Sequence, residues 1–310
     1  MGRALAVPCA TAPAKVTYRK LYASPVVRVS DYTCLAGREG PQAEELCGAN
    51  NVVLMRRGVF SKHFGRRTVT ADVNQAAFFS KGSAYRVAHP AECGDRGTVF
   101  ELSPRVLSDI VEELDPSSEG RPDRPFPFDA GPCETAVFWR HRELVLALEA
   151  ADAEPLWSDV TAIQLVADVL EGAFARHGMK RKPRRRGTDE DHAERVEAAK
   201  AHLASRLSER ITLEGVAEAA QVSPFHLARL FRRHTGVPVH RYLTRLRLRA
   251  SLERLAEGTP DLTELALDLG FSSHGHFTDT FRREFGRTPR EVRRRASRET
   301  LREMGKNLEV

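Results

Sequence analysis

The chain has 310 residues, of which 41% are hydrophobic and 29% are charged, an ordinary composition for a globular protein. No apolar run approaches the roughly 20 residues that cross a bilayer, so the sequence argues against a membrane protein. The first 20 residues lack the apolar segment of a secretory signal, and we expect a loose leader over 1–20 and a cytoplasmic protein. The length predicts two domains.

Cysteine number and charge distribution restrict the function further. The five cysteines form no CxxC pair, so we expect reduced thiols and no structural zinc. The net charge is +6, and residues 181–300 hold 25 Lys and Arg against 17 Asp and Glu. The basic excess therefore lies in the C-terminal part, as expected of a surface that meets phosphates. A solvated basic face without a partner is the alternative interpretation.

Residues 26 to about 102 contain short apolar segments typical of strands, separated by glycine-bearing turns such as KGSAY: VVRV, NVVLM, GVFSKHF, RTVTADV, AAFF and TVFEL. Their spacing predicts a sandwich or a small barrel. From Ser103 the pattern changes to a helix, RVLSDIVEELD, then a proline-rich loop and helices over 134–150 and 156–177. The last is apolar around much of its circumference, so we expect it to be deeply buried or covered by a second copy of the chain.

The segment 180–191, KRKPRRRGTDED, has no apolar residue and predicts a linker. We therefore expect a sensor or dimerisation domain over 21–178, a linker over 179–191 and a helical domain over 192–298. In the helical part, Asp191 is the expected N-cap of the first helix, because Glu194 follows three residues later.

Two segments of the helical part repeat each other: VSPFHLARLFRRHTG at 222–236 and FSSHGHFTDTFRREFG at 271–286. Each follows a short apolar helix, and each pairs a serine start with Phe-Arg-Arg and a closing glycine. The pattern predicts two helix-turn-helix units, in which the second helix lies in the major groove of DNA. A helix over about 239–255 joins them and spans roughly 25 Å, so the two units can reach successive major grooves about 34 Å apart.

The segments ITLEGVAEAAQVSPFHLARLFRRHTG, RYLTRLRLRAS and DLTELALDLGFSSHGHFTDTFRREFGRTPREVRR resemble the DNA-binding domain of the AraC/XylS family of bacterial transcription regulators. The resemblance covers about residues 195–296, a third of the chain. It implies a seven-helix domain in a two-domain α+β protein, a variable N-terminal domain that senses a ligand or dimerises, and usually transcriptional activation. The strand-rich region resembles the cupin-like barrel of many members much more faintly. The partners implied are double-stranded DNA, RNA polymerase, a small-molecule effector that the sequence does not identify, and a second copy of the chain.

The resemblance also points to DNA-contacting residues in each unit. The candidates are Ser223, Phe225, His226, Ala228, Arg229, Arg232, Arg233, Ser273, His274, Gly275, Thr278, Asp279, Arg282 and Arg283. We expect Arg229 to read guanine, with Phe225 and Ala228 beside it, and Arg232 and Arg233 to hold phosphates. The alternative is that Arg229 also only holds a phosphate. Asp279 departs from the family pattern and predicts weaker readout by the second unit.

The N-terminal part offers only weak candidates for a ligand site, namely Tyr85, Arg86 and His89, and the favoured alternative is that they are ordinary turn and rim residues. Because no HxH pair is present, we expect no metal and no cofactor. The chain also lacks GxSxG and P-loop motifs, so an enzyme is not expected. The competing interpretations are a cupin-type enzyme and a DNA-repair methyl-acceptor protein fused to the same domain. The cysteines are too widely spread to resemble the four-cysteine zinc site of the latter.

Overall fold

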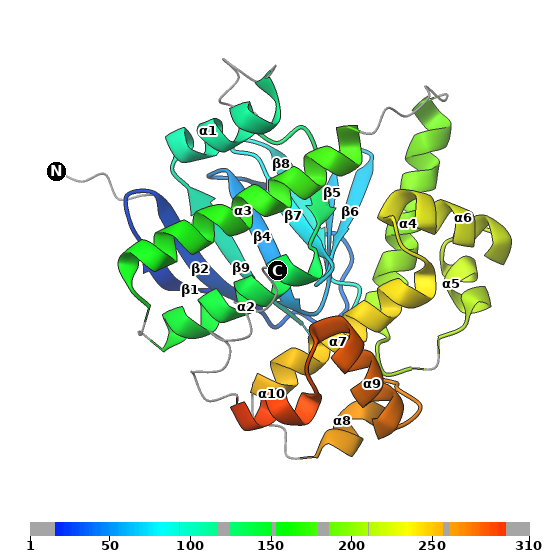
Figure 1. Ribbon diagram of the computed structural model, residues 1–310. Helices are drawn as coiled ribbons and strands as arrows, with labels where there is room; N and C mark the ends of the chain where they lie inside the picture. The colour runs from blue at the N-terminus through cyan, green and yellow to red at the C-terminus, as the bar shows by residue number, and fades with distance from the viewer. Residues whose placement is uncertain are drawn as a thin grey trace.

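The computed structural model describes residues 16–92, 94–116, 125–150, 153–178, 186–209, 211–256 and 261–295 (Figure 1). Strands dominate the first part and helices the second, which confirms the α+β prediction. The leader predicted over 1–20 extends too far, because the first strand already begins at Val16. This segment, VTYRKLYA, is rich in β-favouring residues and pairs along its length with the next strand. Residues 1–15 lie outside the described part.

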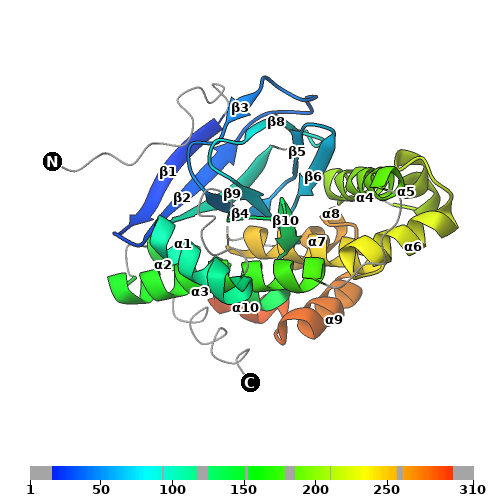
Figure 2. The ribbon, with the colours of Figure 1, turned by 90° about the horizontal axis from the view of Figure 1, so that it is seen from above.

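The ten described strands form two antiparallel sheets. The six-stranded sheet contains, in spatial order, β1 (Val16–Ala23), β2 (Val27–Cys34), β9 (Asp95–Leu102), β4 (Asn51–Arg57), β7 (Gln75–Phe79) and β10 (Ala130–Pro132). The four-stranded sheet contains β3 (Glu45–Leu46), β8 (Ala84–Ala88), β5 (Phe60–Phe64) and β6 (Arg67–Ala71). Figure 2 shows the four-stranded sheet as a second layer, on the side of the six-stranded sheet away from the helices within residues 135–178.

Four of these strands, β1, β3, β8 and β10, were not predicted. In KGSAY only the first residues turn, at Gly82 with φ +75°, and β8 begins two residues later. Strand β10 lies in the proline-rich segment and forms the edge of its sheet, where proline is tolerated. A Cβ on Gly131 would lie 2.6 Å from the Ala173 side chain, so this glycine lets the strand approach a helix closely.

Three helices follow the strands, and α2 and α3 lie across the open face of the six-stranded sheet (Figure 1). They are α1 (Pro104–Leu114), α2 (Thr135–Glu149) and α3 (Pro155–Gly178), close to the predicted ranges. The chain's own core covers much of α3, burying Ala162, Leu165, Val166, Val169, Leu170 and Ala173. Leu156 and Val160 stay exposed. The apolar character of α3 is thus largely explained within one chain, and self-association stays a prediction.

The C-terminal part contains the seven expected helices within its described residues. They are α4 (Arg186–Ser205), α5 (Leu213–Ala219), α6 (Pro224–Thr235), α7 (Val239–Ala256), α8 (Leu262–Asp268), α9 (His274–Phe285) and α10 (Pro289–Arg295). The N-cap expected at Asp191 is wrong, because α4 already begins at Arg186. No proline follows Pro183 in this segment, and a single glycine, Gly187, disfavours a helix by only about 1 kcal/mol, so the charged segment extends it. Residues 179–185 of the expected linker lie outside the described part. In the described residues, no helix has the length and apolarity to cross a membrane.

Capping groups end the repeated helices as the sequence predicts. The Ser223 hydroxyl accepts a hydrogen bond from the His226 backbone N–H at 3.3 Å, and Ser273, rather than Ser272, does the same for His276 at 3.2 Å. Gly236 and Gly286 close the two helices with φ of +80° and +70°, a conformation that favours glycine. The two units therefore share their local chemistry as well as their sequence pattern.

Candidate nucleic-acid interface and cavity

In the first unit, α6 buries one face and exposes a cationic one. Leu227, Leu230 and Phe231 are buried, whereas His226, Ala228, Arg229, Arg232 and Arg233 are exposed. The three arginines are spaced i, i+3 and i+4, so they share one side of the helix. All three border a groove of about 900 Å³ beside α5 and α7. Positive charge is therefore concentrated along this helix. The side chain of Phe225 lies outside the described part of the chain.

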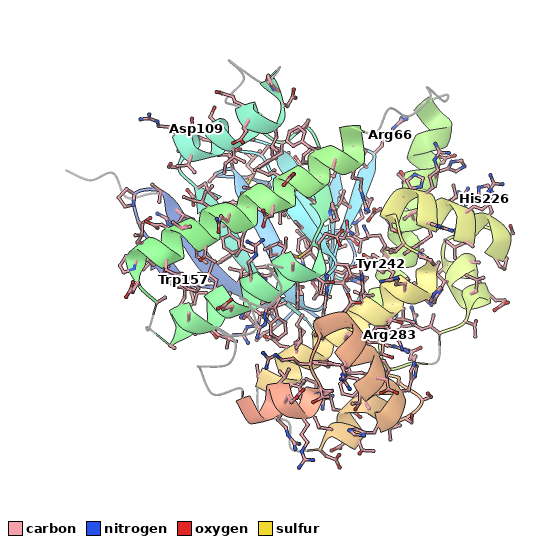
Figure 3. The ribbon with its side chains drawn as sticks, viewed as in Figure 1. Arg66, Asp109, Trp157, His226, Tyr242 and Arg283 are labelled. Atoms are coloured by element: carbon pink, nitrogen blue, oxygen red, sulfur yellow. The ribbon has the colours of Figure 1, made fainter. Side chains whose placement is uncertain are left out.

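In the second unit, α9 is fixed by a row of aromatic rings. Phe277, Phe281 and Phe285 are buried, with ring centroids 5.6 and 4.7 Å apart between successive members. The predicted contact residues His274, Gly275, Asp279, Arg282 and Arg283 are exposed, and Thr278 is half-buried. Figure 3 labels His226 on α6 and Arg283 on α9, in the units that precede and follow α7 in the chain. Asp279, in the first half of α9, occupies the position that Arg229 occupies in α6.

The first unit is tied to the N-terminal part of the chain by polar contacts. Arg176, near the end of α3, donates hydrogen bonds to the backbone carbonyls of His234 and Thr235 at the C-terminus of α6. From α4, the Glu197 carboxylate accepts a hydrogen bond from the Thr70 backbone N–H at 2.5 Å. Thr70 also donates through its hydroxyl to the Glu197 carbonyl at 3.0 Å. Both helices flanking α5 therefore contact the N-terminal part, α4 at strand β6 and α6 at helix α3.

The connecting helix α7 is bound directly to the loop between β6 and β7 (Figure 3). The Tyr242 hydroxyl donates to the carboxylate of Asp72 at 2.5 Å, and both side chains are buried. The Arg249 guanidinium donates to the Val73 carbonyl at 2.5 Å and lies over the Phe138 ring, 4.8 Å from its centroid. Burial raises the pKa of Tyr242 well above its ordinary value, so its hydroxyl keeps its proton.

The second unit contacts α2. The Thr135 hydroxyl donates to the Glu284 carboxylate at 2.6 Å, and the Trp139 and Phe285 rings lie 5.7 Å apart. Between α7 and the sheet lies an ionic cluster in which Asp31, Arg56, Arg142 and Glu253 are buried, while Arg96 and Glu149 lie at its solvent-facing edge. Its shortest pair across this boundary joins Arg142 and Glu253 at 2.8 Å. Each unit, and the helix between them, therefore has its own contact with the N-terminal part.

A cavity of about 90 Å³ lies between the two sheets. Its lining residues come from both layers: Val16, Tyr18, Tyr32, Cys34, Gln42, Glu45, Val53, Phe60, Phe79, Tyr85, Val87, His89, Asp95 and Val99. Two predicted ligand residues, Tyr85 and His89, are among them. Arg86 is not, because successive residues of a strand point to opposite faces, and its side chain is exposed 3.9 Å from Glu44.

The sequence singled out neither Cys34 nor Asp95, which meet His89 at one end of the cavity. The Cys34 sulfur lies 3.7 Å from His89 Nε2, and His89 Nδ1 lies 2.8 Å from an Asp95 carboxylate oxygen. Burial lowers the pKa of His89, but hydrogen bonding to Asp95 and Cys34 and their negative charge raise it more, to about 10. His89 is therefore protonated at neutral pH. His89 and Asp95 lie six residues apart in the segment HPAECGD, but their proximity to Cys34 on β2 depends on the fold.

These three groups are, within the described residues, the one set of potential metal ligands in close proximity, all within 4.8 Å of one another. The Asp95 oxygen is already paired with His89 Nδ1, which leaves the Cys34 sulfur and His89 Nε2 facing each other. A protein metal site normally supplies three or four ligands. The geometry therefore resembles an oriented thiol–imidazole pair more than a metal centre.

Comparisons with known proteins agree with the helical geometry. Residues 216–295 match the family profile described as Helix-turn-helix domain. Over 105 residues the chain is 36% identical to the HTH-type transcriptional activator RhaS of Escherichia fergusonii, and over 93 residues it is 39% identical to RhaS of Salmonella paratyphi B. The C-terminal part is an AraC-type helix-turn-helix domain. This confirms the resemblance to the AraC/XylS family.

The matches to the RhaS proteins cover only part of each chain. The aligned segments span 34% and 30% of this chain and 38% and 34% of the two RhaS chains. Among solved structures, the C-terminal domain of AraT, a response regulator from Geobacillus stearothermophilus, is 28% identical over 33% of this chain and 84% of its own, with a TM-score of 0.32. ToxT from Vibrio cholerae is 11% identical over 91% of this chain and 98% of its own, with a TM-score of 0.34.

Proposed function

We propose that this protein is a sequence-specific DNA-binding transcription regulator whose N-terminal part responds to a small molecule. The observation that carries the proposal is the pair of capped helix-turn-helix units at the two ends of α7. Each exposes the residues that this type of domain turns toward DNA. The cavity between the sheets provides a place for an effector, and the contacts of α7 with the loop at Asp72 provide a route from it to the DNA-binding helices.

The remaining parts of the proposal follow from the relatives' names and from the charge distribution. The RhaS proteins are described as activators, and we extend activation, with RNA polymerase as a partner, to this chain. We also propose a homodimer in the cytoplasm and no enzymatic activity. The test of the whole function is footprinting of the full-length protein across the genome of its source. Binding without any sequence preference would count against it.

Arg229→Ala is expected to weaken binding to the specific site by roughly 1–3 kcal/mol and to relax the choice of base at one position, because an arginine can address guanine with two hydrogen bonds. Arg232→Ala is expected to weaken binding to all sequences alike. It is also expected to lower the slope of log affinity against log salt concentration by about one, because one phosphate contact is lost. Binding titrations of both variants on specific and random DNA, at several salt concentrations, measure both effects.

Arg232 is the matched control for Arg229, since the two lie on the same side of α6 and are both exposed. If the two substitutions cause equal losses on specific and on random DNA, Arg229 holds only a phosphate. The assignment of base reading to this position would then be wrong, although the proposed function would stand.

Asp279→Asn is expected to strengthen binding to specific and random DNA alike. Asp279 is exposed on the first half of α9, where its negative charge faces a polyanion, and repulsion outweighs a possible hydrogen bond to a cytosine amine. The second unit then contributes mainly backbone contacts through Arg282 and Arg283, and the first unit carries most of the specificity.

A titration of wild type and Asp279→Asn on both DNAs, at one fixed salt concentration, decides the point. The matched control is Asp268→Asn, an exposed acid at the end of α8. A loss of affinity confined to the specific site would mean that Asp279 reads a base, and the ranking of the two units would be reversed.

A further inference from the structure

Cys34, His89 and Asp95 form a connected row at the wall of the cavity. The sulfur of Cys34 lies 3.7 Å from His89 Nε2, and the other ring nitrogen of His89 is held by Asp95 at 2.8 Å. The Ala36 backbone N–H also donates to the sulfur, at 3.4 Å. A thiol beside an imidazole that a carboxylate orients is the arrangement by which proteins activate cysteine as a nucleophile.

The backbone, rather than mobile side chains, sets this arrangement. Gly94 has φ +66°, and a Cβ there would lie 2.3 Å from the Cys34 carbonyl oxygen. Gly58 has φ +76°, and a Cβ there would lie 2.8 Å from the Asp95 Cα. Only glycine permits these close approaches. His89 is fixed by two backbone hydrogen bonds with Glu39, at 2.8 and 2.9 Å. The three groups are therefore positioned before any ligand enters.

A hydrogen-bond donor lies next to the thiol on the same strand. Tyr32 precedes Cys34 by two residues, so both side chains leave β2 on the same face, about 7 Å apart. Its buried hydroxyl donates to the Met55 sulfur at 2.9 Å, and a thioether is a weak acceptor. Burial, then the charge of Asp95 and a hydrogen bond to its carboxylate, raise the pKa of Tyr32 well above its ordinary value, so the O–H remains a donor. A ligand carbonyl beside the thiol would compete with Met55 and Asp95 for this O–H.

The rest of the cavity favours a flat, apolar molecule. Phe60, Phe79 and Tyr85 line it, and the Phe79 and Tyr85 rings meet edge to face at 5.0 Å between centroids. The Glu45 carboxylate accepts a hydrogen bond from the Tyr85 hydroxyl at 2.9 Å, so the polar group at that end already has a partner. The titratable groups that line the cavity are Tyr18, Tyr32, Cys34, Glu45, Tyr85, His89 and Asp95.

We propose that the cavity captures a small electrophile with a carbonyl conjugated to a carbon–carbon double bond, such as an enone or a quinone, by addition of Cys34. The sulfur bonds to the β carbon, the π bond breaks, and its electron pair moves onto the carbonyl oxygen, which receives the Tyr32 hydrogen bond. The proton shared by the Cys34 sulfur and His89 Nε2 then passes to the α carbon. Nothing leaves, and no oxidant is consumed. The regulatory consequence, a change in DNA binding, rests on the proposed function.

Two other buried cysteines provide internal controls. Cys133 is enclosed, and burial raises the pKa of its thiol to about 11, which keeps it unreactive. The Cys47 thiol donates to the Ala49 carbonyl at 2.9 Å, and it does not line the cavity. Cys9 and Cys93 lie outside the described residues, so Cys9→Ser and Cys93→Ser define the background for the experiment.

In that background, the full chain is treated with limiting N-ethylmaleimide, a cyclic alkene flanked by carbonyl groups, and each cysteine peptide is followed by mass spectrometry. Cys34 is expected to react about tenfold faster than Cys47 and Cys133. His89→Gln is expected to remove this advantage. Tyr32→Phe is expected to slow the maleimide reaction several-fold but not the reaction with iodoacetamide, in which no charge develops on a carbonyl oxygen.

Labelling of Cys133 reports whether each variant is folded, and Asp95→Asn replaces His89→Gln if that variant unfolds. The proposal is overturned if Cys34 reacts no faster than the two controls, or if equimolar Zn²⁺ blocks its labelling, which would make the three groups a metal site.

A second experiment titrates DNA with the labelled protein. Labelling is expected to change the affinity for DNA several-fold, and this change is expected to be absent in Cys34→Ser. An unchanged affinity overturns the sensing role. Failure of the untreated protein to bind DNA instead contradicts the proposed function and leaves the labelling result intact.

Discussion

Glu253→Ala is expected to lower the free energy of unfolding by about 3–5 kcal/mol, the usual effect of removing one partner of a buried ion pair. Glu253 reaches from α7 into the ionic cluster, where it lies 2.8 Å from Arg142 and 3.9 Å from Arg96. The substitution leaves the buried Arg142 guanidinium without this carboxylate, beside the equally buried Arg56. Denaturant unfolding of the full chain, followed by circular dichroism, measures the loss.

The next residue of α7 supplies the control. Arg254 pairs with Asp268 at the same 2.8 Å, but their side chains are 39% and 46% exposed. Asp268→Ala is therefore expected to cost less than about 1 kcal/mol, because water screens exposed pairs. Equal effects of Glu253→Ala and Asp268→Ala would contradict the packing of α7 against the N-terminal part.

Stability is also expected to fall as pH rises from about 6.5 to about 10, through the titration of His89. Its pKa in the folded chain is about 10, above the ordinary value of 6.5. The folded state therefore holds the proton more tightly than the unfolded state. The stabilisation that protonated His89 gives the folded state is fully present below pH 6.5 and is lost as pH passes through 10. We expect this contribution to be on the order of 3 kcal/mol.

The measurement is the difference in unfolding free energy between wild type and His89→Gln at a series of pH values. That difference is expected to shrink with rising pH. His63→Gln is the matched control, since burial lowers the pKa of His63 and the sign of its effect is opposite. A difference that stays constant across this range would show that the Asp95 contact does not hold a charged imidazole.

Local chemistry explains what the sequence predicted well. The caps at Ser223 and Ser273, the closing glycines, and the apolar faces of α6 and α9 depend on residues within four positions of one another. Such signals can be read without knowledge of the fold. The strand at Ala84–Ala88 shows the limit, because its glycine turn was visible but its pairing with β5, more than 20 residues earlier, was not.

The sites that depend on distant residues were out of reach for the same reason. Cys34 and His89 are 55 positions apart, and Asp72 and Tyr242 are 170 apart. No periodicity links such pairs. A charged residue inside a helix pattern, such as Glu253 or Arg249, also reads as a solvated position until the partner that buries it is known.

Under the proposed function, the attachment of α7 to the sheet restricts how a signal can reach DNA. Arg229 and Asp279, the predicted base-facing residues, are already at the surface, so uncovering them would not be what the N-terminal part controls. The N-terminal part holds α7 at Tyr242, Arg249 and Glu253, which together span most of the helix. A helix held at three points along its length cannot pivot about one of them. Under the proposed function, a signal would therefore have to move α7 and both units together, or release one of these contacts.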